Sequence, residues 1–170
     1  STRMTARKIA EFAPAFVRIY PTLVLKGSPL AGWYTAGKFR PLTLDETVAR
    51  VKSLYLFFQN QSIPVIRMGL QASEELDSEQ TVLAGPYHPA FGHLVLSSIW
   101  LDKATELLAS EKTSSEKAVL HVRPENISKL RGLRNQNIRK LMQQFKMKAI
   151  EVLPDEKLTD EEIRLEWKAT

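Results

Sequence analysis

Positive charge is concentrated between Lys117 and Lys148. This segment holds one carboxylate, Glu125, whereas acidic residues outnumber basic ones from Glu151 onward. Its nine basic residues are Lys117, Arg123, Lys129, Arg131, Arg134, Arg139, Lys140, Lys146 and Lys148. A cluster of one sign attracts phosphate groups, and binding through it weakens as salt is added. The segment is therefore predicted to bind a nucleic acid.

A turn at Gly132 lies in the middle of this basic segment. The pattern predicts a helix that ends at Gly132 and a second helix that begins near residues 135–137, capped by Asn135 or Asn137. Free backbone amides there would lie beside Arg131 and Arg134 and could clamp a nucleic-acid backbone. The alternative is a helix-turn-helix with a solvated basic face and no ligand. The predicted RNA-binding residues are Lys129, Arg131, Gly132, Arg134, Asn135, Asn137, Arg139 and Lys140.

A second candidate site lies on an apolar stretch near the start of the chain. Residues 15–30 form the longest β-branched and apolar run, and the strand they predict should stop near Tyr20 because Pro21 cannot donate a ladder hydrogen bond. Arg18 and Tyr20, with Arg67 on a later strand candidate, would lie where α/β folds bind ligands. We expect them to line a cofactor or substrate site; ion pairing inside the core is the alternative.

Other catalytic chemistry finds little support in the sequence. Cysteine is absent, which excludes disulfides, thiolate zinc sites, catalytic thiols and cysteine-bound iron–sulfur clusters within these 170 residues. His88 and His93 are spaced too irregularly for a helical metal pair, and His88 is expected to fix the turn before a helix. His121 is expected at the surface near the basic segment. We predict no catalytic residue and no metal ligand.

The elements that would position these residues begin with a strand, a helix and a second strand. Thr43 and Glu46 form a T-x-x-E capping box, and apolar residues recur at helical spacing as far as Phe58. A strand candidate follows at residues 65–70. This order is typical of a parallel βαβ unit, which needs further strands and cover on both faces. The N-terminal half is therefore interpreted as the closing portion of a larger β/α barrel or doubly wound sheet.

The rest of the chain predicts a smaller α+β unit. Residues 73–80 are expected to form an acidic solvent loop, residues 81–91 a turn-rich segment, and residues 90–109 a helix. Beyond them we predict a strand at 118–122, helices at 125–131 and 137–145, a strand at 149–153 and a final acidic helix at 159–167. The predicted domains are a partial barrel at 1–110, a polar hinge at 111–116 and a basic α+β extension at 117–170.

Composition narrows the class of protein. The net charge is +5, and no stretch approaches the roughly 18 apolar residues of a membrane span. With no leader resembling a signal peptide, we expect a soluble, cytoplasmic protein.

The basic segment resembles a KH-type domain, in which two helices joined by a GxxG loop pack on a sheet. Gly132-Leu133-Arg134-Asn135 occupies the loop position, with Asn135 where the second glycine would be, and Asn137-Ile138, Leu141 and Phe145 match the second helix. The resemblance implies RNA binding at this loop.

The N-terminal half resembles the later barrel of radical SAM enzymes related to the catalytic subunit of Elongator, nearest to the bacterial type without an acetyltransferase domain. The stretches that carry the resemblance are RIYPTLV (18–24), the cap at Thr43 to Glu46, residues 63–70 and GPYHPAF (85–91). The resemblance implies a TIM-like barrel and, for the parent protein, a [4Fe-4S] cluster that cleaves S-adenosylmethionine. Arg18, Tyr20 and Arg67 would then lie at the barrel mouth.

The missing CxxxCxxC cluster ligands indicate a C-terminal fragment that binds RNA, tRNA being one candidate, and is inactive and cofactor-free alone. Its partners would be RNA and the missing N-terminal half of the barrel. The alternative is a protein-interaction module whose basic face or open sheet edge docks a partner chain, with self-association through the exposed sheet. A complete enzyme that works without a cluster would need a metal or acid–base set that the sequence does not display.

Overall fold

The computed structural model describes residues 2–71, 81–111 and 115–168. The chain forms two compact units, residues 1–95 and 96–170. The elements of the first unit are α1 (Thr2–Glu11), β1 (Val17–Ile19), β2 (Val24–Leu25), α2 (Pro29–Thr35), α3 (Leu44–Asn60), β3 (Val65–Met68), β4 (Val82–Ala84) and the start of α5 (Phe91–Ser110).

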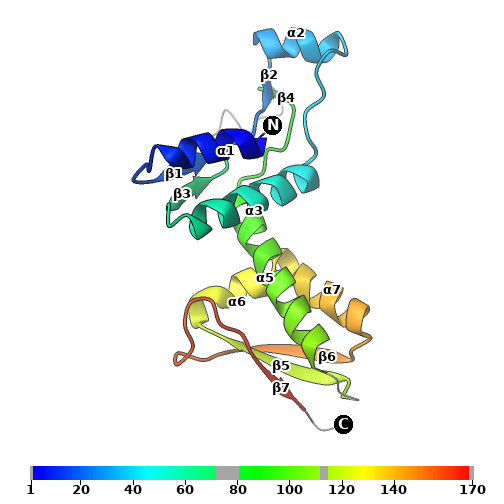
Figure 1. The fold of residues 1–170 in the computed structure, drawn as a ribbon. Coiled ribbons are helices and arrows are strands. Elements are labelled where there is room, and N and C mark those ends of the chain that lie inside the picture. Colours follow the sequence, from blue (N-terminus) through cyan, green and yellow to red (C-terminus); the bar gives the residue numbers. More distant parts are fainter. Residues whose placement is uncertain (1, 72–80, 112–114, 169–170) are drawn as a thin grey trace. The chain divides into compact units, whose positions relative to one another are not determined.

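The first unit is organised around a parallel strand pair, β1 and β3, connected through α3 (Figure 1). This pairing confirms the predicted βαβ unit. Helix α3 begins where expected, because the Thr43 hydroxyl accepts the Glu46 N–H at 3.2 Å while the Glu46 carboxylate accepts the Thr43 N–H at 2.8 Å. The strand also stops at Ile19, one residue before Tyr20, as Pro21 requires.

Apolar side chains cover one face of this strand pair. Ala6 of α1 and Leu54 and Phe58 of α3 form a buried cluster against which Val17 and Val65 pack. A second cluster joins Val51 of α3 to Phe91 and Val95 at the start of α5. The hydrophobic effect therefore holds α1, α3 and the start of α5 against one face of the strand pair.

Strands β2 and β4 pair in antiparallel fashion as a separate two-stranded sheet. The sequence predicted only a turn-rich segment at residues 81–91 and so missed β4. A strand of three residues offers too short a pattern to be recognised before its partner is known. No closed barrel is formed by the described residues, and the first unit is a mixed α/β fold with two small sheets.

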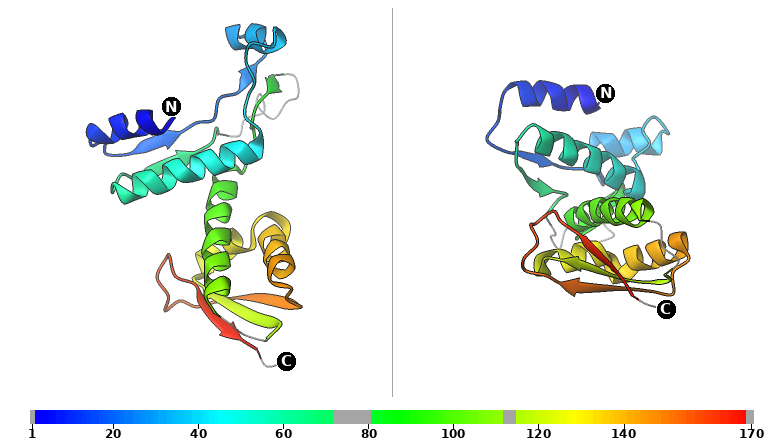
Figure 2. Two further views of the ribbon diagram at one scale, coloured as in Figure 1. Left: turned by 45° about the vertical axis from the view of Figure 1, so that its right-hand side comes forward. Right: turned by 60° about the horizontal axis from the view of Figure 1, so that its bottom comes forward.

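The second unit packs helices on one face of a three-stranded sheet (Figure 2). Its remaining elements are β5 (Lys117–Val122), a 3-10 turn at Pro124–Asn126, α6 (Ile127–Arg131), a 3-10 turn at Leu133–Asn135, α7 (Gln136–Phe145), β6 (Ala149–Pro154) and β7 (Arg164–Trp167). The sheet order is β6-β5-β7, with β5 parallel to β6 and antiparallel to β7. Trp100 and Leu108 of α5, Leu130 of α6 and Leu141 of α7 meet Leu120 of β5 in one core.

The prediction of a final acidic helix at 159–167 is wrong. Residues Arg164–Trp167 form β7 instead, in which the half-buried Leu165 and Trp167 alternate with the exposed Arg164 and Glu166. Pairing along β5 supplies backbone hydrogen bonds to this segment, and Leu165 and Trp167 pack against the core. Inward and outward side chains therefore alternate every second residue, as in a strand, instead of following the helical period that we expected for this acidic segment.

The division of the chain into two units is set by the packing of α5. The boundary falls between Val95 and Leu96, inside α5. The physical reason is that Trp100, Ala104 and Leu108, in the later turns of α5, are buried in the core of the second unit. Residues 112–114 of the predicted hinge, and the predicted loop at 73–80, lie outside the described residues.

Candidate nucleic-acid interface

The turn between α6 and α7 has an unusual backbone. Gly132 ends α6 with φ 69° and ψ 174°, a conformation that is open essentially only to glycine. Arg134 (φ 51°, ψ 39°) and Asn135 (φ 58°, ψ 26°) both adopt left-handed torsions. Gly132 therefore lies at the helix end that the sequence predicted. Asn135, in the place of a second glycine, adopts the left-handed form that asparagine tolerates better than most residues.

Asn137 lies beneath this turn and not on its surface. Its side chain is 1% exposed, and its amide donates to the Ser97 carbonyl at 2.9 Å and to the Lys129 carbonyl at 3.3 Å. A Cβ at Gly132 would come within 2.8 Å of Asn137 Cγ. The prediction that Asn137 contacts RNA is therefore corrected: this residue supports the turn from within the core.

The backbone amides of the turn are less available than expected. The Asn135 N–H donates to the Gly132 carbonyl at 3.2 Å, and the Gln136 N–H donates to the Leu133 carbonyl. The Asn135 side chain precedes α7 but makes no capping hydrogen bond. Any clamp on a phosphate backbone would thus depend on side chains more than on free amides.

The predicted RNA-binding cations lie on or beside the turn without acidic partners. Lys129 Nζ donates to Asn126 Oδ1 at 2.7 Å, Arg131 Nη2 to the Val152 carbonyl at 3.3 Å, and Arg139 Nη1 to the Arg134 carbonyl at 2.6 Å. In the part of the chain that the structure describes, no carboxylate forms an ion pair with Lys129, Arg131, Arg134, Arg139 or Lys140. Their charges are therefore available to a ligand.

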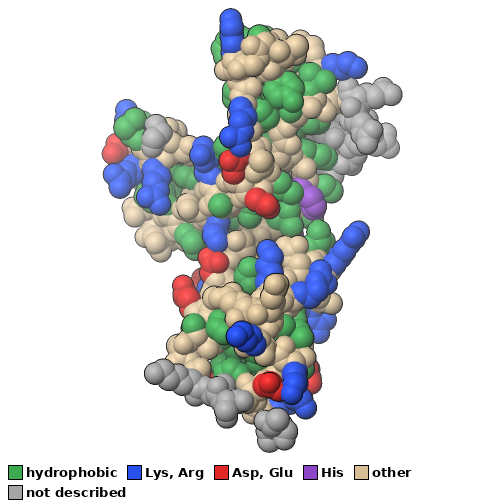
Figure 3. Space-filling view, turned by 90° about the vertical axis from the view of Figure 1, so that its right-hand side faces the viewer, with side chains coloured by type: hydrophobic (Ala, Val, Ile, Leu, Met, Phe, Trp, Pro, Cys, Tyr) green, Lys and Arg blue, Asp and Glu red, His purple; other side chains and the backbone are tan. Residues whose placement is uncertain are grey.

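Several other cations of the second unit are neutralised. Arg123 pairs with Glu125 at 2.7 Å and with Asp160 at 2.9 Å. The Arg123 hydrogen bond holds the pKa of the Glu125 carboxyl below its usual value. Arg164 and Lys168 also have carboxylate partners, at 2.8 and 2.9 Å. Lys and Arg side chains are visible on the second unit in the lower part of Figure 3, with a few acidic side chains among them.

Arg18 and Arg67 lie side by side on the first unit, and Tyr20 follows directly after the end of β1. Arg18 of β1 and Arg67 of β3 are register partners in the parallel pair, and both are exposed. The Arg18 guanidinium lies 6.0 Å from the centre of the Phe16 ring, and Arg67 Nη1 donates to Gln71 Oε1 at 2.9 Å. Neither arginine is ion-paired with a carboxylate of the described residues.

His88 and His121 make hydrogen bonds within the fold. His88 Nδ1 accepts the Ala90 N–H at 3.0 Å, which fixes the turn before α5 as predicted. His121 on β5 lies 3.0 Å from a carboxylate oxygen of Glu166 on β7. The described ranges contain no group of three His, Asp or Glu side chains that could hold a metal ion, nor a helix long and apolar enough to cross a membrane.

The comparison with known families identifies the class of protein. Residues 14–100 match the family model for the Radical_SAM C-terminal domain, just over half of the 170 residues. The chain therefore belongs to the radical SAM C-terminal domain family, which confirms the radical SAM part of the sequence interpretation. No match was found among curated proteins or among solved structures.

The family implies a [4Fe-4S] cluster and S-adenosylmethionine for the parent protein. Such clusters are held by cysteine thiolates, and this chain has no cysteine. The residues present therefore do not fit the cluster, and its ligands cannot come from these 170 residues. The match ends at residue 100, so the Gly132 turn lies outside it.

Proposed function

We propose that this chain is the C-terminal part of an Elongator-like radical SAM protein and that its second unit binds RNA, with tRNA as the candidate. The family match supports the first half of this proposal. The second half, RNA binding by a KH-like unit, is supported by the order β5-α6-α7-β6, with a glycine turn between the helices and all four elements around one core. By itself the chain should catalyse nothing, because it has no thiolate to ligate a cluster.

The RNA proposal rests on one observation: the cations around the turn lack carboxylate partners, whereas several cations elsewhere in the second unit have them. Five cations of α6, the turn and α7 have no carboxylate partner among the described residues, whereas Arg123, Arg164 and Lys168 do. Phosphate contacts dominate nucleic-acid affinity, and each contributes about 0.7 to 0.9 to the slope of log K against log salt. Leu133, 39% exposed at the centre of the turn, adds an apolar surface for an unstacked base.

The test is a titration of fluorescent tRNA with the full chain at two salt concentrations. Arg134→Glu with Lys140→Glu changes two exposed cations whose side chains make no hydrogen bond or ion pair in the described structure. Lys117→Glu with Lys157→Glu is the matched control, because both lysines are exposed outside the turn and the change of charge is equal. We expect the turn variant to bind about tenfold or more weakly and with a smaller salt slope.

The RNA proposal would fail if the two double variants bound equally well, or if the unaltered chain showed no binding at low salt. Equal loss in both variants would indicate attraction to net charge without a defined interface. Circular dichroism of each variant establishes that the fold is intact.

A second candidate function rests on the open face of β1 and β3. Val17 and Val65 pack into the core, while Phe16, Arg18 and Ile66 on or beside these strands remain exposed. Parallel sheets are normally covered on both faces. We propose that further strands complete a β/α barrel over this face in the parent protein and that the chain alone self-associates through it.

Size-exclusion chromatography with light scattering tests this second function. A dimer that persists at high salt and dissociates on Ile66→Glu supports it, because burial of apolar surface is insensitive to screening. A monomer at both salt concentrations contradicts it.

A further inference from the structure

The first unit carries an excess of positive charge of its own. Residues 2–71 contain ten Lys and Arg residues but only three carboxylates, Glu11, Asp45 and Glu46. This excess is comparable with that of the segment between Lys117 and Lys148. The question is whether it is spread over the surface or gathered at a place that could hold a ligand.

Three adjoining hollows run along helix α3 of this unit, with volumes of about 380, 540 and 370 Å³. The first and second share Arg3, Ser53 and Leu54 as lining residues. The second and third share Thr2, Arg50 and Leu54. Neighbouring hollows share lining residues and therefore adjoin, and we refer to the three together as the α1–α3 groove.

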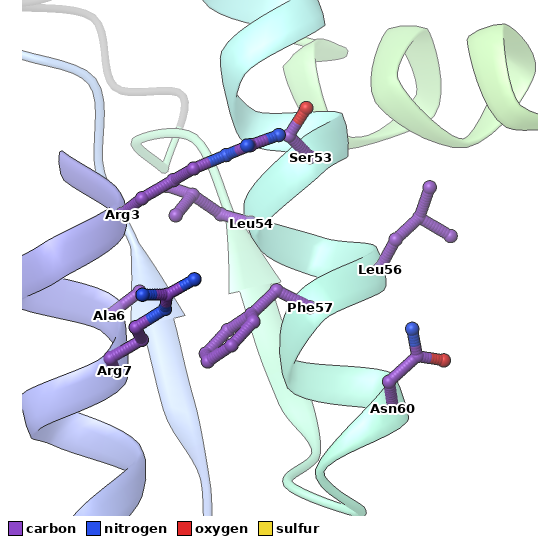
Figure 4. A pocket seen from close by; sticks show the side chains of 8 residues that line it. All are labelled: Arg3, Ala6, Arg7, Ser53, Leu54, Leu56, Phe57 and Asn60. Carbon is purple, nitrogen blue, oxygen red and sulfur yellow. The ribbon is translucent and has the colours of Figure 1, made fainter.

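Arginines line this groove from one end toward the other. Arg3 and Arg7 are four residues apart on α1, so they lie on the same side of that helix. Figure 4 shows Arg3 extending toward Ser53 of α3, and Arg7 beside Phe57. Arg50 of α3 lines the second and third hollows. None of these three arginines is ion-paired with a carboxylate of the described residues.

The acidic lining residue of the groove is already neutralised. Glu46 accepts two hydrogen bonds from Arg40, at 3.1 and 3.2 Å, and one from the Thr43 N–H. The Thr43 backbone bond, together with Arg40, holds the pKa of the Glu46 carboxyl below its usual value. The groove therefore keeps the net positive charge of Arg3, Arg7 and Arg50.

Two aromatic side chains lie at the third hollow. Tyr20, which is 46% exposed, and the half-buried Phe39 both line it, together with apolar residues such as Pro41 and Leu42. A cationic track that ends at aromatic rings is the arrangement that binds single-stranded nucleic acids without strict sequence preference. The cations follow the backbone, and the rings accept stacked bases.

We propose that the α1–α3 groove binds single-stranded RNA, with phosphates against Arg3, Arg7 and Arg50 and a base against Tyr20 or Phe39. The inference rests on the proposed function for its choice of ligand but uses residues of the other unit. Helix α1 lies outside the residues that match the radical SAM family model. An acidic peptide could pair with the same cations, but it has no bases to stack on the two aromatic rings.

The experiment measures binding of a fluorescent single-stranded RNA of roughly 12 nucleotides to the full chain over a salt series. Arg3→Gln, Arg7→Gln and Arg50→Gln are combined in one groove variant. Lys8→Gln, Lys26→Gln and Lys38→Gln form the matched control, since these lysines are exposed, do not line the groove and remove the same charge. Both variants are also made together with Arg134→Glu and Lys140→Glu.

We expect the groove variant to lower the salt slope by about 2, near 0.7 for each lost phosphate contact, while the control lowers it by clearly less. RNA that contains 4-thiouridine should crosslink to Tyr20 or Phe39, and Tyr20→Leu should reduce the yield while Tyr34→Leu, at an exposed ring on α2, should not. Equal binding by the groove variant and the control, or crosslinks that avoid both rings, would overturn the proposal. So would competition by polyglutamate but not by unlabelled RNA.

The additional pair of substitutions separates this proposal from the previous one. If Arg134→Glu with Lys140→Glu has no effect and the groove variant still loses binding, the turn proposal fails and the groove proposal stands. The opposite pattern overturns the groove proposal alone.

Discussion

Substitution of Gly132 by alanine tests the structural account of the turn directly. A Cβ at this position would lie 2.8 Å from Cγ and 2.9 Å from Oδ1 of Asn137. The Asn137 side chain cannot move away freely, because it is buried and hydrogen-bonded to the carbonyls of Ser97 and Lys129. Either the backbone leaves its conformation or the buried amide loses its partners.

The expected cost has two parts. Placing a non-glycine residue at φ 69° and ψ 174° costs about 1 to 3 kcal/mol. Displacing the buried Asn137 amide from its carbonyl partners costs about 1 to 3 kcal/mol more. Gly132→Ala should therefore lower the free energy of unfolding of the second unit by about 2 to 5 kcal/mol, with the two parts not strictly additive.

Urea unfolding followed by tryptophan fluorescence measures this change, because Trp100 lies in the core of the second unit. Gly37→Ala, followed by circular dichroism of the whole chain because Gly37 lies in the first unit, is the control for the backbone part: Gly37 has φ 70°, but a Cβ there meets no atom within 4 Å. In an Asn137→Ala background, Gly132→Ala should lose most of its contact cost. A change below about 0.5 kcal/mol on Gly132→Ala alone would refute the reasoning.

Two further predictions concern stability. Leu130→Ala, at a side chain with no exposed area, should cost about 2 to 5 kcal/mol, whereas Leu133→Ala, 39% exposed on the turn, should cost well under half of that; urea unfolding of both variants decides this, and equal costs would contradict the assigned core. Asp155 has a lowered pKa, first because it accepts the Lys157 N–H and then because Arg164 donates to it. Its stabilisation is therefore present above the ordinary value of 3.8 and fades as the pH falls through the lower folded-state pKa. Asp155→Asn should thus destabilise the protein at pH 6 and converge with the unaltered chain in thermal melts at strongly acidic pH; a gap that stays constant with pH would contradict this.

Local sequence signals predicted much of the fold. The capping box at Thr43 and Glu46 and the breaker Pro21 act within a few residues of themselves, so the beginning of α3 and the end of β1 could be predicted without knowledge of their neighbours. The same holds for Gly132 as the end of α6. Strands β4 and β7 were missed or misassigned, because three or four residues become a strand only through a partner that is distant in sequence.

The candidate sites also combine features that local sequence predicts with features that depend on distant packing partners. Sequence spacing predicted the turn and its cations but placed Asn137 among the RNA contacts, since the burial of a polar side chain depends on what packs over it. The α1–α3 groove was not predicted, because Arg3 and Arg7 on α1 and Arg50 on α3 meet only when the two helices pack together. The signal available beforehand was the basic excess of residues 2–71.

By itself the sequence determined the covalent chemistry of this chain: without cysteine it supplies no thiolate, and most of its basic residues fall in two stretches. The tertiary structure decided which of those charges remain free. Arg123 is neutralised by Asp160 from 37 residues further along the chain, while Arg134 and Lys140 keep their charge. The reason is that an ion pair needs atoms within about 4 Å of each other, and folding sets that proximity where composition cannot.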